Sequence, residues 1–151
     1  MVRPARPGDL PDLLRLEQLF PGDRLSRRSF LHLLQRGHAD LLVAEGADGL
    51  TGDAVILYRQ ESTTARLYSI IVTPSARGCG IGYTLLEASE AAARAHGRTD
   101  MVLEVRTDNS TALALYYRAG YRSMKHLPDY YQDGAAGLRL AKSLSNTVDK
   151  K

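Results

Sequence analysis

The chain of 151 residues and 16.6 kDa is long enough for one domain that buries its own core and needs no disulfide or metal ion for stability. Its net charge of +3 comes from arginines scattered among acids, with no basic run and no interleaving of basic and aromatic residues, which argues against a nucleic-acid-binding protein. It has a lone cysteine, a basic, proline-containing start, and no apolar run near the roughly 20 residues of a membrane span. We therefore expect a cytoplasmic protein that binds no membrane. We also expect it to be a monomer or a weak homodimer.

Two helices are predicted at the start of the chain. Asp9 is a candidate N-cap for the first, whose leucines recur at helical spacing until residues 20–23 end it. Ser26 can cap the second, and Gly37 suits its left-handed C-terminal position. Runs of apolar and β-branched residues predict six strands, at residues 39–45, 54–59, 65–72, 101–106, 121–127 and 138–144.

The strand over residues 65–72 is expected to be central, because apolar residues occupy both faces, with Leu67 and Ile71 on one and Ile70 and Val72 on the other. A third helix begins at Ile81 and ends at Gly97. A fourth, short helix is capped by Asn109 or Asp108 and ends at Gly120.

Parallel strands require a helical crossover, so this order of elements predicts an α/β fold with a mixed sheet of six or seven strands and helices on both faces. Residues 1–144 would form one domain. Residues 145–151 are small, polar and charged, and are expected to form a disordered tail.

The most informative segment lies between the central strand and the third helix, and reads Arg77-Gly78-Cys79-Gly80-Ile81-Gly82. Three glycines in five residues let several backbone N–H groups converge on one point without Cβ atoms in the way. The spacing matches neither the dinucleotide-binding Gly-x-Gly-x-x-Gly nor a P-loop, so a nucleoside triphosphate is disfavoured. The residues alone allow both a phosphate-binding loop and a structural turn that starts the helix.

This loop resembles the pyrophosphate arm of the GNAT superfamily of N-acetyltransferases, which binds coenzyme A. A downstream segment is similar to the RimI-like branch of that superfamily, which acetylates protein N-termini, in Leu103-Glu104-Val105-Arg106, Asn109-Ser110-Thr111-Ala112, Ala114-Leu115-Tyr116 and Gly120-Tyr121. The loop over residues 128–134 is similar to the same branch. The resemblance covers residues 2–144, and implies the GNAT fold with splayed central parallel strands and acetyl-CoA as co-substrate.

By this resemblance, two segments would hold acetyl-CoA. The loop N–H groups and Arg77 would bind the pyrophosphate, while the backbone of the central strand would pair with the pantetheine amides and polarise the thioester carbonyl. Asn109 resembles the residue that touches pantetheine, and a role as helix cap is its alternative. The expected cofactor-binding residues are therefore Ile70, Ile71, Val72, Arg77, Gly78, Cys79, Gly80, Ile81, Gly82 and Asn109.

Neither a cysteine nucleophile nor a metal site is expected. The Cys79 thiol would lie by the pyrophosphate, far from the acetyl group, and no histidine is near it in the sequence. The four histidines show no metal-ligand spacing.

Acetylation of an amine needs a base that deprotonates the ammonium and a donor for the departing thiolate. The resemblance to RimI-like enzymes assigns these roles to Glu104 and Tyr116. Glu104 could instead be a strand carboxylate paired with Arg106 or another arginine, and Tyr116 could fill the core. A phenol has an ordinary pKa of about 10 and a thiol of about 8.5, so transfer of a proton from Tyr116 to the thiolate would be uphill. Tyr116 would therefore donate either a proton or only a hydrogen bond to the sulfur.

The acceptor is expected to be a protein N-terminus, such as that of a ribosomal protein. An α-amine with a pKa near 8 is roughly a tenth neutral at pH 7, far more than a lysine. Tyr130 and Tyr131 would wall the peptide entrance, as in RimI-like enzymes. Ala135-Ala136-Gly137 replaces acids that the family usually carries, so a lysine, polyamine or other small amine stays open as acceptor. Outside enzymes, the alternative is a non-catalytic acyl-CoA sensor.

Overall fold

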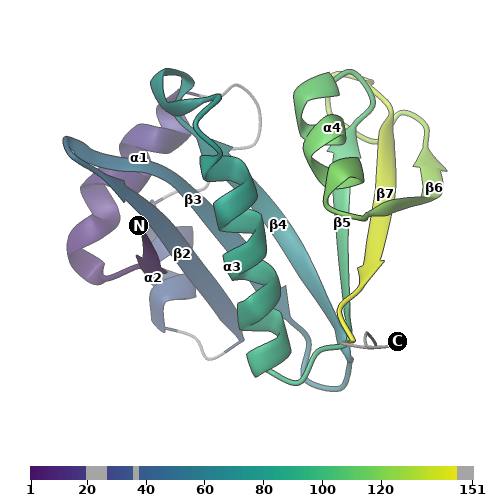
Figure 1. The fold of residues 1–151 in the computed structure, drawn as a ribbon, viewed down its shortest axis with the longest axis horizontal. Helices are drawn as coiled ribbons and strands as arrows, with labels where there is room; N and C mark the ends of the chain where they lie inside the picture. The colour runs from purple at the N-terminus through teal and green to yellow at the C-terminus, as the bar shows by residue number, and fades with distance from the viewer. Residues whose placement is uncertain (20–26, 36–37, 146–151) are drawn as a thin grey trace.

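The computed structural model describes residues 1–19, 27–35 and 38–145. Seven strands form one mixed sheet in the order β1-β2-β3-β4-β5-β7-β6 (Figure 1). The elements are β1 (Val2–Pro4), α1 (Leu10–Gln18), α2 (Arg27–Gln35), β2 (Ala39–Gly46), β3 (Gly49–Tyr58), β4 (Thr64–Val72), α3 (Ile81–Ala95), β5 (Asp100–Arg106), α4 (Ser110–Arg118), β6 (Arg122–Leu127) and β7 (Gly137–Ser143). The predicted α/β fold is confirmed, with β1 as a seventh strand.

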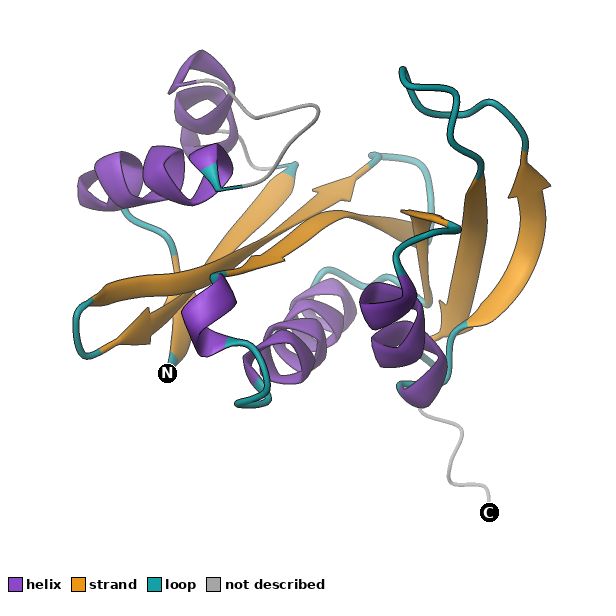
Figure 2. Ribbon diagram, turned by 90° about the horizontal axis from the view of Figure 1, so that it is seen from above, coloured by secondary structure: helices purple, strands orange, loops and turns teal. Residues whose placement is uncertain are grey.

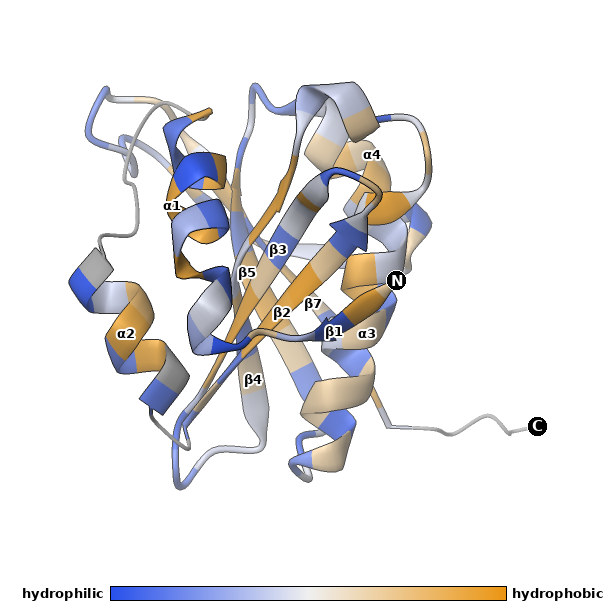
Figure 3. Cartoon of the chain, turned by 90° about the vertical axis from the view of Figure 1, so that its left-hand side faces the viewer, coloured by the Kyte–Doolittle hydropathy of each residue, from blue (hydrophilic) through white to orange (hydrophobic). Residues whose placement is uncertain are grey.

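The helices cover both faces of the sheet. α1 and α2 lie on one side, and α3 and α4 lie on the other (Figures 2 and 3). Each side has its own apolar core. The core under α1 and α2 includes Leu13, Leu16 and Phe30, and the core under α3 and α4 includes Leu85, Leu103 and Leu140. None of the helices in the described ranges is long and apolar enough to cross a bilayer.

The two central strands separate along their length. β4 and β5 are the only parallel pair among the described strands, and they pair only where Thr64–Arg66 meets Asp100–Val102. Beyond these positions the strands diverge (Figure 1). The edge of β4 that faces β5 therefore has no strand partner from Leu67 to Val72, and the expected splay is confirmed.

A β-bulge in β4 changes which side chains share a face. Val55 pairs with Ser69 and Ile56 pairs with Leu67, so Tyr68 has no partner on β3. Ile70 consequently packs with Leu67 against the α3 core. The expectation of unbroken alternation over this strand is wrong, because one inserted residue exchanges the faces of everything after it.

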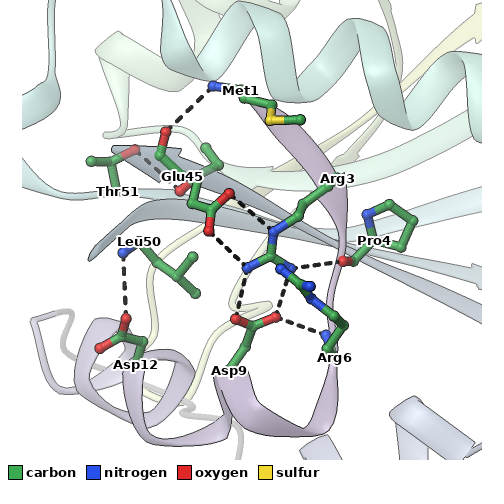
Figure 4. A network of polar contacts seen from close by, with 10 residues as sticks. Met1, Arg3, Pro4, Arg6, Asp9, Asp12, Glu45, Leu50 and Thr51 are labelled. Carbon is green, nitrogen blue, oxygen red and sulfur yellow. Dashed lines mark hydrogen bonds and ion pairs between the residues drawn. The ribbon is translucent and has the colours of Figure 1, made fainter. Parts of the chain in front are cut away.

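The first strand is held by a network around Arg3 (Figure 4). Its guanidinium pairs with Asp9 at 2.9 Å and with Glu45 of β2 at 3.2 Å, and holds the pKa of both carboxyl groups below their ordinary values. Asp9 also accepts a hydrogen bond from the Arg6 N–H at 2.7 Å. It stands at the N-cap of α1, but its side chain makes no capping bond to that helix, contrary to the prediction.

Other helix ends agree with the sequence. Gly97 and Gly120 follow α3 and α4 with φ of +73° and +102°, and Asn109 caps α4 by accepting a hydrogen bond from the Ala112 N–H at 3.1 Å. β3 begins at Gly49, earlier than predicted, because Gly52 and Asp53 conceal the strand pattern. The predicted end of α1 at residues 20–23, Ser26, Gly37 and the tail after residue 145 lie outside the described residues.

Candidate active site

The glycine-rich loop presents unused backbone donors at the start of α3. Gly78 and Gly80 have φ of +85° and +78°, a conformation that residues with a Cβ rarely adopt. Within the described ranges, the N–H groups of residues 78–82 have no hydrogen-bond partner, and they lie at the positive end of the α3 dipole. The geometry suits an anion, and its identity as the pyrophosphate of coenzyme A stays a prediction.

The unpaired edge of β4 leads directly into this loop. Ile70, Ile71 and Val72 lie on it, with β3 on their other side. The Thr73 N–H donates to the Thr51 carbonyl at 2.8 Å and fixes the exit of the strand. Cys79 is exposed in the loop. Asn109 uses its carbonyl oxygen in the α4 cap, and its contact with pantetheine stays a prediction.

Glu104 lies in the middle of β5 with its side chain only 8% exposed, between two arginines. Arg66 Nη2 is 2.6 Å from Oε1, and Arg139 Nε is 2.9 Å from Oε2. Arg139 is the residue directly opposite Glu104 on β7. An ion-paired Glu104 was one of the two alternatives for this residue, but Arg106 is not its partner.

The two arginines hold the carboxylate without using all of its acceptor capacity. An ionised carboxylate has about four lone-pair sites, of which the two guanidinium groups use two. The remaining sites can accept a proton from an amine or a water. Arg66 is the last β4 residue paired with β5, so the carboxylate lies next to the point where the strands separate.

Tyr116 packs into the α3 core with its ring edge-on to Tyr121 at 5.8 Å. Burial, with a smaller effect of nearby Tyr131, raises the pKa of Tyr116 to about 12. Full proton transfer to a thiolate with a pKa of about 8.5 would then be uphill by about 5 kcal/mol. The raised pKa therefore favours Tyr116 as a hydrogen-bond donor over Tyr116 as a proton donor.

A short chain of polar contacts holds Tyr121, the ring against which Tyr116 packs. The Tyr121 hydroxyl donates to Glu90 of α3 at 2.9 Å, and Lys142 of β7 lies 3.0 Å from the same carboxylate. Glu90 is almost completely buried, and burial together with the charge of this carboxylate raises the pKa of Tyr121. These contacts tie α3 to β7 and fix the ring against which Tyr116 packs.

The loop between β6 and β7 places Tyr130 and Tyr131 against each other and beside Arg106 of β5. The Tyr130 and Tyr131 rings meet edge-on at 5.0 Å, and the Arg106 guanidinium lies 5.3 Å from the Tyr131 ring centre and 2.8 Å from Asp133. Burial raises the pKa of Tyr131, and the nearby side chains of Tyr130 and Glu104 raise it further. Tyr131 thus lies near both Glu104 and Tyr116.

The sequence did not identify three residues with unusual surroundings, two beside Glu104 and one buried in β3. Arg66 and Arg139 gave no signal without the strand register that places them beside Glu104. Asp53 of β3 is fully buried, and neither carboxylate oxygen has a hydrogen-bond partner in the described part of the chain. Burial and the nearby charge of Glu17 raise its pKa to about 8. Asp53 had no clear signal in the sequence, because it lies just before the strand predicted over residues 54–59.

Comparison with known proteins identifies the family. Residues 9–121 match the acetyltransferase (GNAT) family. An N-alpha-acetyltransferase of Sulfurisphaera tokodaii is 30% identical over 95% of this chain and 92% of its own length. An uncharacterized N-acetyltransferase of Methanocaldococcus jannaschii is 37% identical, and that match spans 60% of this chain and 59% of the relative.

Solved structures share this fold. The ribosomal-protein-S18-alanine N-acetyltransferase of Escherichia coli has a TM-score of 0.84 at 24% identity, over 96% of this chain and 94% of that one. Ard1 of Thermoplasma volcanium has a TM-score of 0.84 at 25% identity, over 95% and 96% of the two chains. The family match, together with the splayed sheet and the glycine-rich loop, shows that this chain belongs to the GNAT family of acetyltransferases.

Proposed function

We propose that this protein transfers the acetyl group of acetyl-CoA to the N-terminal α-amine of a protein, within a ternary complex. The observation that carries the proposal is the placement of Glu104, which is held by two arginines beside the opening between β4 and β5. The relative named N-alpha-acetyltransferase, which aligns over nearly the whole chain, supports the choice of acceptor.

Two backbone segments would bind the co-substrate. The N–H groups of residues 78–82 would bind the pyrophosphate, assisted by the α3 dipole and Arg77. The free edge of β4 would hydrogen-bond the pantetheine amides as a neighbouring strand does, and one N–H of Ile70, Ile71 or Val72 would polarise the thioester carbonyl.

Two side chains would then handle charge during transfer. Glu104 takes a proton from the ammonium, directly or through a water, and the freed lone pair forms the new C–N bond. The C–S bond breaks, and the sulfur leaves with the electron pair while Tyr116 donates a hydrogen bond to it. The nitrogen releases its second proton through water to this sulfur, which gives the amide and the thiol of coenzyme A. The proton on Glu104 passes to solvent. Tyr130 and Tyr131 would line the entry of the acceptor.

Transfer to defined peptides tests this function. With acetyl-CoA, we expect mass spectrometry to show acetylation of the α-amine of an alanine-initiated peptide. A matched peptide with a blocked N-terminus and one lysine should react far more slowly, because its amine is almost wholly protonated near pH 7. Faster modification of that lysine, or binding of coenzyme A with no acceptor modified, would overturn the proposal.

A substitution in the loop should weaken coenzyme binding separately from any effect on the acceptor. A Cβ at Gly80 meets no atom within 4 Å, so Gly80→Ala would place a methyl group where the phosphates are expected. We expect about a tenfold weaker affinity for coenzyme A by calorimetry, the effect of losing one charge-assisted hydrogen bond.

The matched control is Gly97→Ala at the other end of α3. Gly97 has a φ of +73°, close to the +78° of Gly80, and the same open space around it. Both variants therefore carry similar backbone strain, and Gly97→Ala should keep the affinity. Equal affinities of the two variants would contradict the assignment of the phosphate site.

A further inference from the structure

Among the residues that the structure describes, one face of the sheet carries more cations than carboxylates. α1 and α2 lie over β2 to β4, and no described helix lies over the same face of β5, β7 and β6 (Figure 2). The strand register puts two rows of residues across this uncovered face. The first row is Glu104, Arg139 and Lys125, and the second is Val102, Ala141 and Arg122. Arg66 joins them through its contact with Glu104. We call Arg66, Arg122, Lys125 and Arg139 the cationic face.

The charges of this face are not balanced. In the two rows, Glu104 is the single carboxylate, and Arg66 and Arg139 already contact it. Arg122 and Lys125 are exposed and have no ion-pair partner among the residues that the structure describes. Lys125 lies directly opposite Arg139, an arrangement of like charges that destabilises a strand pair. Arg106, in contrast, is neutralised by Asp108 and Asp133.

We propose that the cationic face binds acidic side chains in the first residues of the acceptor protein, just after the amine that is acetylated. This inference rests on the proposed function. The Arg66 side chain is 47% exposed and can exchange the Glu104 carboxylate for one from the acceptor. That exchange frees Glu104 Oε1 to accept the proton of the amine, while Arg139 keeps Oε2 in place. Arg66 is therefore a specificity-determining residue.

The dimensions of the face set the positions that it reads. Lys125 lies two strands away from Glu104, or about 10 Å at the usual spacing between strands. An extended peptide advances roughly 3.3 Å per residue, so an acceptor with its amine at Glu104 reaches Lys125 with about its third or fourth residue. Arg66 is close enough for the second residue. The expected acceptor has aspartate or glutamate at positions two to four.

Matched peptides test this inference. Two peptides with the same N-terminal alanine are compared by kcat/KM. One has aspartate and glutamate at positions two to four, and the other has asparagine and glutamine there. We expect the acidic peptide to be preferred roughly tenfold by the unaltered protein, the effect of two or three surface ion pairs. The preference should shrink as salt is raised from about 0.05 M to about 0.5 M.

Charge reversal on the edge strand locates the effect. In Arg122→Glu with Lys125→Glu, the ratio of acidic to amide peptide should fall to about one or invert. Arg118→Glu, an exposed charge reversal on α4, should keep the ratio. Arg122 and Lys125 lie on an edge strand, where cations also discourage pairing between molecules. Variants that aggregate and keep the ratio would overturn the inference in favour of that role.

The failure of this inference differs from failure of the proposed function. Equal kcat/KM for acidic and amide peptides overturns the cationic face as a specificity surface and leaves α-amine acetylation intact. Absence of turnover with every peptide, combined with acetylation of spermidine, overturns both.

Discussion

Replacing Asp53 with asparagine should remove a stability loss of about 3–4 kcal/mol that the unaltered protein undergoes between about pH 5 and pH 8. Asp53 is fully buried in β3, and neither oxygen has a partner within the described residues. Burial, with the charge of Glu17, raises the pKa of Asp53 from 3.8 to about 8 in the folded protein.

The direction follows from which state binds the proton. Between about pH 4 and pH 8 the folded protein keeps the proton on Asp53, while the unfolded chain has released it. Unfolding then releases a proton, and a rising pH favours it. The stabilisation is complete below about pH 4 and is lost as the pH rises through the folded pKa. The asparagine side chain introduced by Asp53→Asn cannot ionise, so its contribution is independent of pH.

Denaturant unfolding at a series of pH values measures this effect as the difference between the two proteins. Groups unchanged by the substitution cancel in that difference. Asp48→Asn, in the exposed hairpin turn between β2 and β3, is the matched control and should follow the unaltered protein. If Asp53→Asn has the same pH dependence as the unaltered protein, Asp53 is ionised when folded, and a partner or water must stabilise its charge.

The sequence predicted the features of the fold that depend on local pattern. The glycines of the loop, the Asn109 cap and the helix ends at Gly97 and Gly120 all require particular residue types at particular backbone angles. The order of strands and helices then limited the sheet to a mixed topology. The cap, the helix ends and the mixed sheet are confirmed, and the first two could be predicted because each rests on neighbours in the chain.

Features that depend on register could not be predicted. The bulge at Tyr68 exchanges the faces of β4, yet nothing in an apolar run shows where one residue is left unpaired. Arg66 and Arg139 are separated from Glu104 by 38 and 35 residues in the numbering, and only strand pairing brings them together. The sequence therefore allowed Arg106 or another arginine as the partner of Glu104, and the Arg106 guanidinium instead binds Asp108 and Asp133.

The two residues proposed to act in transfer should differ in how their loss depends on pH. Tyr116 has a pKa raised to about 12, so its hydroxyl stays protonated through the range in which the enzyme can be assayed. A hydrogen bond from this hydroxyl to the leaving sulfur is then present at every pH. Removal of a base, in contrast, matters most when the acceptor amine is protonated.

Glu104→Gln should therefore lower kcat on the order of a hundredfold at pH 7, and less at pH 9, where most of an α-amine with a pKa near 8 is already neutral. Glu90→Gln is the matched control, because Glu90 has a 6% exposed side chain paired with Lys142, much as the 8% exposed Glu104 is paired with arginines. It should lower the free energy of unfolding and leave the shape of the pH–rate profile unchanged. Turnover is measured from about pH 6 to pH 9 and normalised to the fraction of protein that is folded. If Glu104→Gln only loses stability, as Glu90→Gln does, Glu104 serves the sheet as an ion pair, and another group must accept the proton of the amine.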